Sequence, residues 1–307
     1  MQLINTFAII VIGIIISRFL EDPESYIKVL NNMTFNLFLP VLILMLLWKG
    51  NVSRLSMNFA IAVLLPFFIA FTIVLLILKV IKKDRKAVAM YPLASVFGNL
   101  AYLGLPIISS ILGRSGLELA IFVVLVHTLT FFTFGIIWVS IFTYGSITTK
   151  RVLQISMRNP LVISSLIGVI LSSLHIPLSS ILEQILNMLG NVALPSSLLL
   201  VGMWVGNEMF SKGLTLDIKN LSDTLFIVFF KMFFLPFIFY LLIFLGHLNL
   251  SMLEIKVIII QLSMPLAIVN FIIAKEYDCH ADTIARAVII STLLLPITVH
   301  VLNSYIH

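Results

Sequence analysis

Two long apolar stretches of the sequence each contain an asparagine beside residues that disturb helices. They carry Asn99, Gly104 and Pro106 in one stretch and Ser263, Pro265 and Asn270 in the other. Proline normally interrupts a helix, and a helix that restarts after a break presents unpaired N–H groups and a partial positive charge. Two such ends that meet form a site for a carboxylate or another anion. We predict that these six residues bind substrate; the alternative is that the asparagines only join helices.

Two titratable side chains and a third asparagine join this set. Lys231 lies about nine residues into an apolar segment, roughly 14 Å from its end, where a charge costs a few kcal/mol. It is a candidate counter-charge for an anion, or a lysine that extends its ammonium group to the membrane surface. His127 is a candidate for proton coupling, or else a packing residue. Asn36 opens the sequence Asn-Leu-Phe-Leu-Pro and is the last candidate substrate contact.

Carboxylates are missing from the middle of the apolar segments. All thirteen Asp and Glu residues fall in predicted loops or in the first turn of a segment. A carboxylate-type sodium or proton antiporter and an aspartyl protease therefore lack the groups they need. The sequence also lacks the common hydrolase, zinc-protease and P-loop patterns, and Cys279 is its single cysteine. We predict no enzymatic activity, no metal site and no cofactor.

The composition places these residues in a membrane protein. Of the 307 residues, 61% are hydrophobic and 10% are charged, and the mean hydropathy is +1.17. Soluble domains are about 45 to 50% apolar and about 25% charged, and one core of this size cannot hide so much apolar surface. We predict an all-α integral membrane protein in the lipid bilayer. The net charge of +6 is interpreted through loop asymmetry and not as nucleic-acid binding.

Hydrophobic runs separated by charged or Gly/Pro-containing stretches predict ten transmembrane helices. The first run has no basic region and no cleavage site, so we interpret it as a retained helix rather than a signal peptide. The sixth run is the shortest. The predicted segments are 3–20, 29–48, 55–78, 87–112, 117–142, 160–174, 181–206, 222–246, 255–274 and 283–303.

The distribution of Lys and Arg predicts the orientation of these segments. With the N-terminus outside, fourteen of the nineteen basic residues fall on the cytoplasmic side and four on the other, while Lys231 lies inside a segment. Cytoplasmic loops carry an excess of Lys and Arg. We therefore expect both termini to be extracellular or periplasmic, in the plasma or inner membrane.

The two halves of the sequence carry similar proline motifs. Asn-x-x-Leu-Pro occurs at 36–40 and 191–195, and Leu-Pro-Phe at 65–67 and 235–237, so the matched prolines are 155 and 170 positions apart. These offsets predict a five-helix repeat, which is inverted because five is odd. We expect a first repeat over 1–142, a short cytoplasmic linker over 143–159 and a second repeat over 160–307. The alignment of helix 4 on helix 9 stays open, since both Pro92 and Pro106 are possible counterparts of Pro265.

Three short motifs occur in order along the chain: Asn99 with Leu103-Gly104-Leu105-Pro106, the stretch 271–277, and Leu295-Pro296-Ile297-Thr298. In these residues the chain resembles the auxin efflux carrier family, which includes bacterial carriers of malonate and similar acids and the plant PIN-type auxin exporters. The resemblance implies broken crossover helices 4 and 9, a homodimer, and export or exchange of organic anions. It further implies that Asn99 meets the substrate carboxylate and that Pro106 is the crossover proline of the first repeat. Asn270 stands where PIN-type members have proline and the linker is short, which favours a bacterial-type carrier.

We therefore expect a secondary transporter that moves small organic anions, such as mono- or dicarboxylates or auxin-like acids, by alternating access around the crossover. Because no mid-membrane carboxylate is available to bind a coupling cation, we expect electrogenic efflux or exchange. The alternatives are a sodium- or proton-coupled symporter of the bile-acid transporter type, and a non-transporting membrane receptor or assembly protein. Sodium dependence of uptake would identify the first, and failure of any anion to bind or move in liposomes would favour the second.

Overall fold

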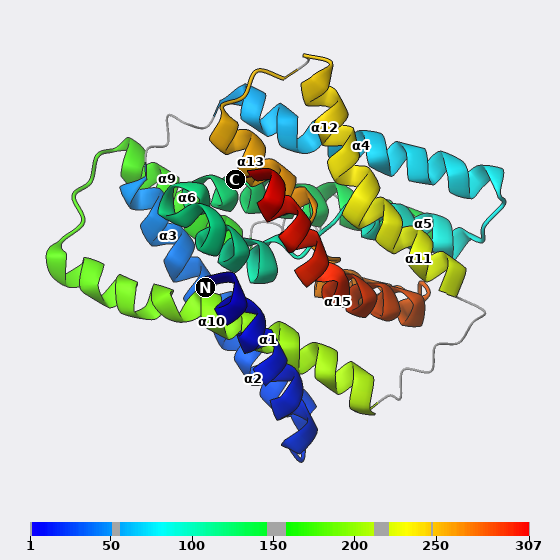
Figure 1. The fold of residues 1–307 in the computed structure, drawn as a ribbon, viewed down its shortest axis with the longest axis horizontal. Helices are drawn as coiled ribbons and strands as arrows, with labels where there is room; N and C mark the ends of the chain where they lie inside the picture. The colour runs from blue at the N-terminus through cyan, green and yellow to red at the C-terminus, as the bar shows by residue number, and fades with distance from the viewer. Residues whose placement is uncertain (1, 51–55, 146–157, 212–220, 247, 307) are drawn as a thin grey trace. The chain divides into compact units, whose positions relative to one another are not determined.

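The computed structural model describes residues 2–50, 56–145, 158–211, 221–246 and 248–306, which are mainly helical (Figure 1). Within these ranges the only bridge between extended residues joins Gly98 and Leu266. Helices are expected in an apolar chain, because lipid offers no hydrogen bonds and an α-helix satisfies its own backbone groups. The all-α prediction is confirmed for this part of the chain.

The chain divides into two compact units, and each combines pieces from both halves of the sequence. Unit 1 consists of Met1–Ser56, Ala101–Leu125 and Met157–Leu214, and unit 2 of Met57–Leu100, Val126–Ser156 and Thr215–His307. These units are groups of neighbouring helices, whereas the predicted repeats are pieces of sequence. The repeat boundaries at 142 and 160 therefore stay predictions.

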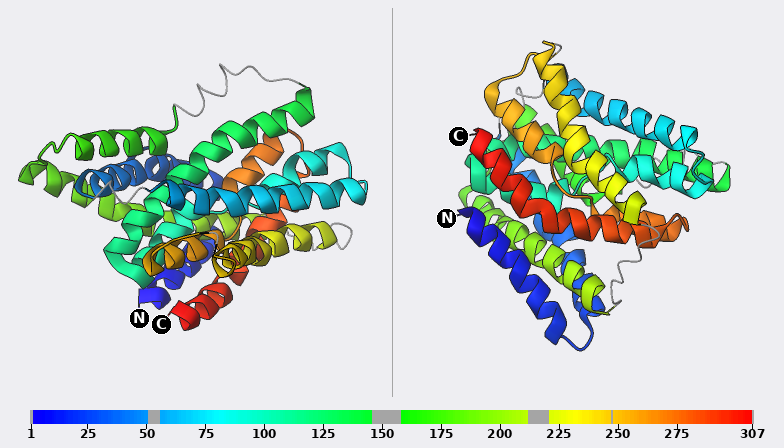
Figure 2. Two further views of the ribbon diagram at one scale, coloured as in Figure 1. Left: turned by 90° about the horizontal axis from the view of Figure 1, so that it is seen from above. Right: turned by 45° about the vertical axis from the view of Figure 1, so that its right-hand side comes forward.

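Unit 1 is built mainly on two pairs of packed helices. Its elements include α1 (Gln2–Phe19), α2 (Pro23–Met33), η1 (Thr34–Phe38), α3 (Leu39–Lys49), α9 (Pro160–Ser173) and α10 (Ser180–Ser211). α1 packs along α10, as Figures 1 and 2 show from different directions, and α3 packs along α9. Asp22 begins α2, because its carboxylate accepts a hydrogen bond from the Ser25 amide.

Small residues set the distance between the packed helices of unit 1. A Cβ atom on Gly13 would lie 2.5 Å from the Leu199 carbonyl oxygen, and one on Gly202 would lie 2.1 Å from a backbone oxygen of α1. The α3–α9 contact is similar, since a Cβ on Gly168 would lie 3.0 Å from the Leu44 carbonyl oxygen. Membrane helices associate through such close backbone approach. Larger side chains at these glycines would push the helices apart.

Unit 2 contains most of the remaining helices. Its elements include α4 (Met57–Val80), α5 (Arg85–Ala94), η4 (Phe131–Gly135), α7 (Ile136–Tyr144), α11 (Leu221–Phe229), η6 (Phe230–Phe234), α12 (Leu235–Phe244), α13 (Met252–Leu262), α14 (Ile268–Glu276) and α15 (Ala281–Ile306). α6 (Leu105–Thr130) begins in unit 1 and ends in unit 2. Aromatic edge contacts from Phe71 to Phe134 and Trp138 hold α4 against η4 and α7.

All ten predicted transmembrane segments are helical over most of their length. Six described stretches are long and apolar enough to cross a membrane: Pro23–Lys49, Met57–Val80, Leu100–Thr143, Ser180–Phe210, Leu221–Phe244 and Ala281–Ser304. The longest stretch contains Gly113, whose φ of 63° and ψ of −155° are not helical, between the fourth and fifth predicted segments. These features support a multi-pass membrane protein, whereas ten crossings in two inverted repeats stay a prediction.

Four five-residue π-helices interrupt the α-helices of the described ranges: η1, η3 (Leu100–Gly104), η4 and η6. Such turns make up well under 1% of residues in ordinary proteins and are frequent at functional sites. η1 contains Asn36, η3 ends at Gly104, and η6 contains Lys231. Three of the predicted site residues therefore lie inside π-helices.

Candidate functional site

Two helical segments of unit 2 are interrupted, and the interruptions lie against each other. The chain leaves the helix over residues 95–99 after α5, and again over residues 263–267 after α13. Gly98 in the first break and Leu266 in the second form an antiparallel bridge. The bridge aligns the two breaks residue by residue. Neither Pro92 nor Pro106 lies within the first break, and which of them corresponds to Pro265 in the repeat stays open.

Three hydrogen bonds join the two breaks. The Asn99 amide donates to the Pro265 carbonyl at 2.7 Å, and the Ala267 amide donates to the Phe97 carbonyl at 3.3 Å. The side-chain amide of Asn270 also donates to the Phe97 carbonyl, at 2.9 Å. These bonds satisfy backbone groups that the breaks remove from the helices, which is necessary inside a membrane. Asn99, Pro265 and Asn270 are thus brought together as the sequence predicts.

Lys231 points into unit 2 and not toward the membrane surface. Its side chain is 1% exposed, and its Nζ donates a hydrogen bond to the Leu262 carbonyl at 2.6 Å. Leu262 is the last residue of α13, and the C-terminal end of a helix carries a partial negative charge. Among the residues that the structure describes, no carboxylate lies within ion-pair distance of this ammonium group. A buried lysine is therefore held beside the paired breaks without an acidic partner.

Gly98 makes the room that Lys231 occupies. A Cβ atom at this position would lie 2.8 Å from Lys231 Cε and 2.9 Å from Lys231 Nζ. Contacts this short are not found for real side chains, so glycine is needed for the observed position of the lysine. Gly98 is not among the predicted site residues, although a glycine directly before Asn99 is a signal in the sequence.

Several buried polar atoms around the breaks have no hydrogen-bond partner within the described protein. They are Ser95 Oγ, Asn99 Nδ2, both ring nitrogens of His127, both side-chain polar atoms of Gln261, and Asn270 Oδ1. Each unsatisfied buried group costs about 1 to 3 kcal/mol. Such a cluster is typical of a place that water or a polar ligand fills. The sequence analysis did not select Ser95 or Gln261 as site residues.

His127 belongs to this cluster through its aromatic neighbours. Its ring meets Phe67 edge-on with centroids 5.5 Å apart and lies 6.3 Å from the ring of Phe97, which is in the first break. The side chain is 1% exposed. The aromatic contacts fit the packing interpretation, whereas the unpartnered nitrogens leave the proton-coupling interpretation as a prediction.

Two serines support the second break. The Ser263 hydroxyl donates to the Ile259 carbonyl of its own helix at 2.7 Å, so its proton is already used. Ser291 of α15 accepts a hydrogen bond from the Leu266 amide at 3.1 Å. Ser291 fixes the bridging residue from outside the broken helix. Nothing in its sequence surroundings indicates this role, because the contact joins residues on different helices.

Pro106 continues a helix rather than breaking one. It is the second residue of α6, and it lacks the N–H that would bond to the Tyr102 carbonyl. The Ser197 hydroxyl donates to that carbonyl instead, at 3.0 Å. The side chain of Tyr102 in turn donates to Asn31 Oδ1 at 2.7 Å. The interruption of the fourth predicted segment therefore precedes Pro106 by seven residues.

The remaining predicted residues also lie in unit 1. Gly104 is buried at the end of η3, and Asn36 is exposed in η1, where its side-chain amide donates to the Asn32 carbonyl at 3.1 Å. Asn99, Ser263, Pro265, Asn270, Lys231 and His127 lie in unit 2. Asn36, Gly104 and Pro106 thus belong to a different unit from the paired breaks.

The cluster in unit 2 is chemically suited to an anion. α14 begins at Ile268 directly after the second break, and no side chain caps its first amide groups. The first amides of a helix have no partner in a preceding turn, although the third one here, that of Asn270, donates to the Ala267 carbonyl at 3.0 Å. Together with the Lys231 side chain and the unpartnered Nδ2 of Asn99, the first two amides of α14 supply hydrogen-bond donors and a partial positive charge. The described residues place no carboxylate in contact with this cluster.

Comparisons with known proteins identify the family of this chain. The chain matches the sequence profile of the family described as membrane transport protein over residues 1–143 and 146–303. It is also similar to an uncharacterized transporter of Methanothermobacter thermautotrophicus strain Delta H. The two sequences are 26% identical over an alignment of 301 residues, which covers 95% of this chain and 93% of that protein. Both findings point to a transporter rather than an enzyme. The chain, with its several membrane-length apolar helices, belongs to the membrane transport protein family.

Proposed function

We propose that this protein is a secondary transporter of small organic anions, such as mono- or dicarboxylates or auxin-like acids, with its binding site at the paired breaks of unit 2. The observation that carries the proposal is the buried ammonium group of Lys231, which hydrogen-bonds to the Leu262 carbonyl and has no acidic partner among the described residues. A buried cation is costly unless an opposite charge meets it. A bound carboxylate supplies that charge during transport.

The donors around the breaks favour a carboxylate over a neutral solute. Asn99 is 5% exposed and its Nδ2 has no protein partner, so a ligand oxygen satisfies it without displacing another bond. The first amides of α14 are the second source of donors. Hydrogen bonds to a charged acceptor are about twice as strong as neutral ones. Asn270 plays a different part, since one of its N–H groups already holds the Phe97 carbonyl.

Contacts within unit 1 support the inverted repeat that alternating access requires. Three pairs of identical residues are each 155 positions apart in the sequence: Gly13 and Gly168, Leu44 and Leu199, and Pro40 and Pro195. Gly13 contacts Leu199, and Gly168 contacts Leu44. In each contact the glycine of one half of the sequence meets the leucine of the other half, so the two contacts are equivalent. This is the relation expected of two inverted five-helix repeats, whose exchange of conformation opens the site to either side.

Two ion pairs within the chain agree with the proposed orientation. Lys83 pairs with Asp223, and Lys49 pairs with Glu183, and each pair joins segments that the charge distribution places on one side of the membrane. We include in the proposal a homodimer in the plasma or inner membrane, with both termini outside. Loop residue Asn51, which belongs to the predicted outer side, lies outside the described residues.

A cation-coupled symporter is the second candidate, and the unpartnered atoms near the breaks favour it. Gln261 Oε1, Asn270 Oδ1 and the ring nitrogens of His127 are buried acceptors or titratable atoms without protein partners. Such atoms suit a site for a proton or a hydrated cation. The two candidates differ in what drives flux, because uniport follows the membrane potential and symport follows the gradient of the coupling ion.

Reconstituted protein separates these candidates. A thermal-shift screen of carboxylic acids on the purified protein identifies a substrate, and flux of that acid is then measured from proteoliposomes under potassium-valinomycin potentials of either sign. We expect outward movement of the anion when the inside is negative, since 100 mV supplies about 2.3 kcal/mol per charge and supports a gradient of about fiftyfold. Lys231→Met should slow this flux at least tenfold, whereas Lys28→Met, which removes an exposed charge, should not.

Three results would count against the proposal. Flux that ignores the potential but follows an imposed sodium or pH gradient would replace uniport with symport. Full activity of Lys231→Met would remove the counter-charge argument. If no anion stabilises the protein or crosses the liposome membrane, a receptor or assembly role becomes the better interpretation.

A further inference from the structure

We propose that the connection between α4 and α5 is a binding surface for the headgroups of anionic phospholipids. Five of the eight residues from Lys79 to Lys86 are basic and one is acidic. They begin in the last turn of Met57–Val80, which is long and apolar enough to span a membrane. Clusters of roughly four to eight basic residues beside a membrane helix attract anionic lipid headgroups. This surface lies apart from the paired breaks, and the proposal does not depend on the transported substrate.

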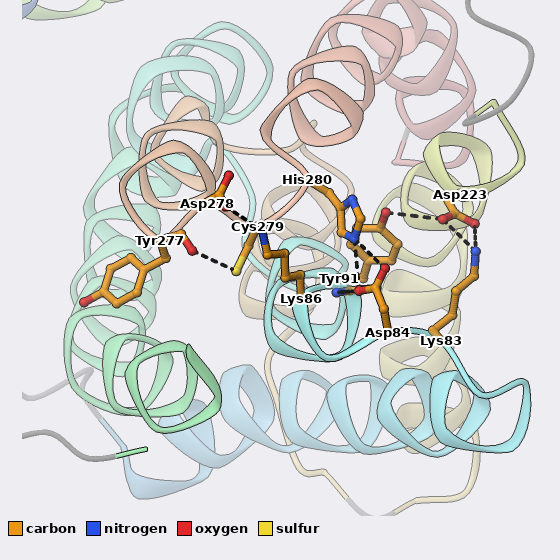
Figure 3. A network of polar contacts seen from close by, with 10 residues as sticks. Lys83, Asp84, Lys86, Tyr91, Asp223, Tyr277, Asp278, Cys279 and His280 are labelled. Atoms are coloured by element: carbon orange, nitrogen blue, oxygen red, sulfur yellow. Dashed lines mark hydrogen bonds and ion pairs between the residues drawn. The ribbon is translucent and has the colours of Figure 1, made fainter. Parts of the chain in front are cut away.

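Two of the five basic residues are neutralised within unit 2 and fix the connection in place. Lys83 Nζ lies 2.6 and 2.7 Å from the two carboxylate oxygens of Asp223, which also accepts a hydrogen bond from Tyr91 at 3.2 Å (Figure 3). Lys86 pairs with Asp278. The hydrogen bond from Lys86 lowers the pKa of the Asp278 carboxyl, so this pair is charged at neutral pH. The connection is thereby held to α11 and to the turn before α15.

The other three basic residues, Lys79, Lys82 and Arg85, are exposed and have no acidic partner in the described structure. The nearby carboxylate of Asp84 is already engaged. It accepts a hydrogen bond from the first turn of α5 at 2.7 Å and lies 2.9 and 3.0 Å from His280 Nε2 (Figure 3). Three positive charges therefore remain on a short segment whose shape is fixed by its neighbours.

Two apolar side chains lie between these charges and are also exposed. Val80 is 79% exposed and Ile81 is 53% exposed, between Lys79 and Lys82 in the sequence. Lys82 has a φ of 54°, so the chain turns sharply directly after the apolar pair. Apolar side chains beside cations are typical of protein surfaces at the boundary between headgroups and acyl chains. Val80 and Ile81 can enter the hydrocarbon while Lys79, Lys82 and Arg85 meet lipid phosphates.

The simplest alternative is that these basic residues only direct the orientation of the protein during insertion. That role needs positive charge in the connection but no preference for a lipid headgroup after folding. The two interpretations therefore differ in the lipid selectivity of the folded protein.

The test counts lipids retained by the purified protein. Full-length protein is reconstituted in equal amounts of dioleoylphosphatidylglycerol and dioleoylphosphatidylcholine, extracted in detergent at 0.1 M salt, and its bound lipids are counted by native mass spectrometry. We expect preferential retention of phosphatidylglycerol by at least about tenfold, since each charge near a headgroup contributes roughly fivefold in affinity and three charges together contribute up to about a hundredfold. The triple variant K79Q/K82Q/R85Q should lose this preference. The matched variant K28Q/R158Q/K275Q removes three other exposed charges and should keep it.

Three outcomes would overturn the proposal: the triple variant retains phosphatidylglycerol like the wild type, the matched variant loses it equally, or the wild type shows no preference. Salt gives a test that needs no variant. The screening length falls from about 10 Å at 0.1 M to about 3 Å at 1 M, so wild-type retention of phosphatidylglycerol should decrease strongly at 1 M salt. Retention that does not change with salt would contradict binding through these charges.

Discussion

Gly98→Ala tests whether the glycine exists to make room for Lys231. The added Cβ would lie 2.8 Å from Lys231 Cε and 2.9 Å from Nζ, whereas ordinary contacts of this kind begin near 3.4 Å. The end of the lysine must therefore move by about half an ångström or more, and this movement lengthens the 2.6 Å hydrogen bond to the Leu262 carbonyl. A hydrogen bond of a charged group contributes about 1.5 to 3 kcal/mol. We expect Gly98→Ala to lower the free energy of unfolding by part of this amount, because a bond lengthened to about 3.1 Å is weakened but not lost.

A double-mutant cycle separates this cause from a general cost of a larger residue in the break. In the Lys231→Met background there is no ammonium group to displace, and the flexible thioether adapts to its surroundings, so Gly98→Ala should cost less than about 1 kcal/mol. Gly135→Ala is the matched control. Its Cβ would lie 2.9 Å from Leu93 Cδ1, a comparable contact without a hydrogen bond, and its cost should be the same in both backgrounds.

Reversible unfolding in mixed micelles, followed by helical circular dichroism, measures the four free energies of each cycle. A coupling energy of about 1 to 2 kcal/mol between positions 98 and 231, with none between 135 and 231, would support the reasoning. Equal costs of Gly98→Ala in both backgrounds would refute it, since the glycine would then serve the backbone of the break and not the lysine.

Three further predictions concern other contacts of the chain. Asn99→Ala should weaken substrate binding about tenfold or more at unchanged stability, whereas Asn270→Ala should also lower the free energy of unfolding by about 1 kcal/mol, because only the Asn270 side chain holds a backbone carbonyl. Ligand titration and thermal unfolding of both variants measure these effects, and equal stability of the two variants would contradict the assigned roles. Gly202→Leu should unfold or strongly destabilise the protein by separating α1 from α10, so a wild-type melting temperature would sink the close-packing argument. In a Cys279→Ser background, an impermeant thiol reagent should label Ser180→Cys but not Glu21→Cys in intact cells, and the reverse pattern would overturn the orientation.

The helices themselves could be predicted from the sequence because their signal is local. A run of apolar residues long enough to span a bilayer indicates a helix wherever it occurs. The interruption at Pro265 was predicted for the same reason, since proline disturbs its own helix. Pro106 shows the limit of this rule. A hydroxyl from Ser197 satisfies the Tyr102 carbonyl that the proline leaves free, so the helix continues.

The centre of the candidate site could be predicted only in part, because its contacts join distant residues. The depth of Lys231 in its segment indicated a functional lysine, but its direction depends on the end of α13, 31 residues later in the chain. The pairing of Gly98 with Leu266 and the support from Ser291 are likewise invisible to motifs read one segment at a time. The selected asparagines lie at the paired breaks, whereas their different hydrogen-bond roles depend on contacts between distant segments.

The two breaks are equally long, with five residues from 95 to 99 and five from 263 to 267, and this equality has a consequence for how the chain can evolve. In an antiparallel pair, a shift of one residue turns the following side chains to the opposite face. Inserting or deleting one residue in either break would move Asn99 or Ala267 out of register with its partner. We therefore expect the lengths of these two segments to change only together, so that descendants of this protein vary the residues within the breaks and keep their length.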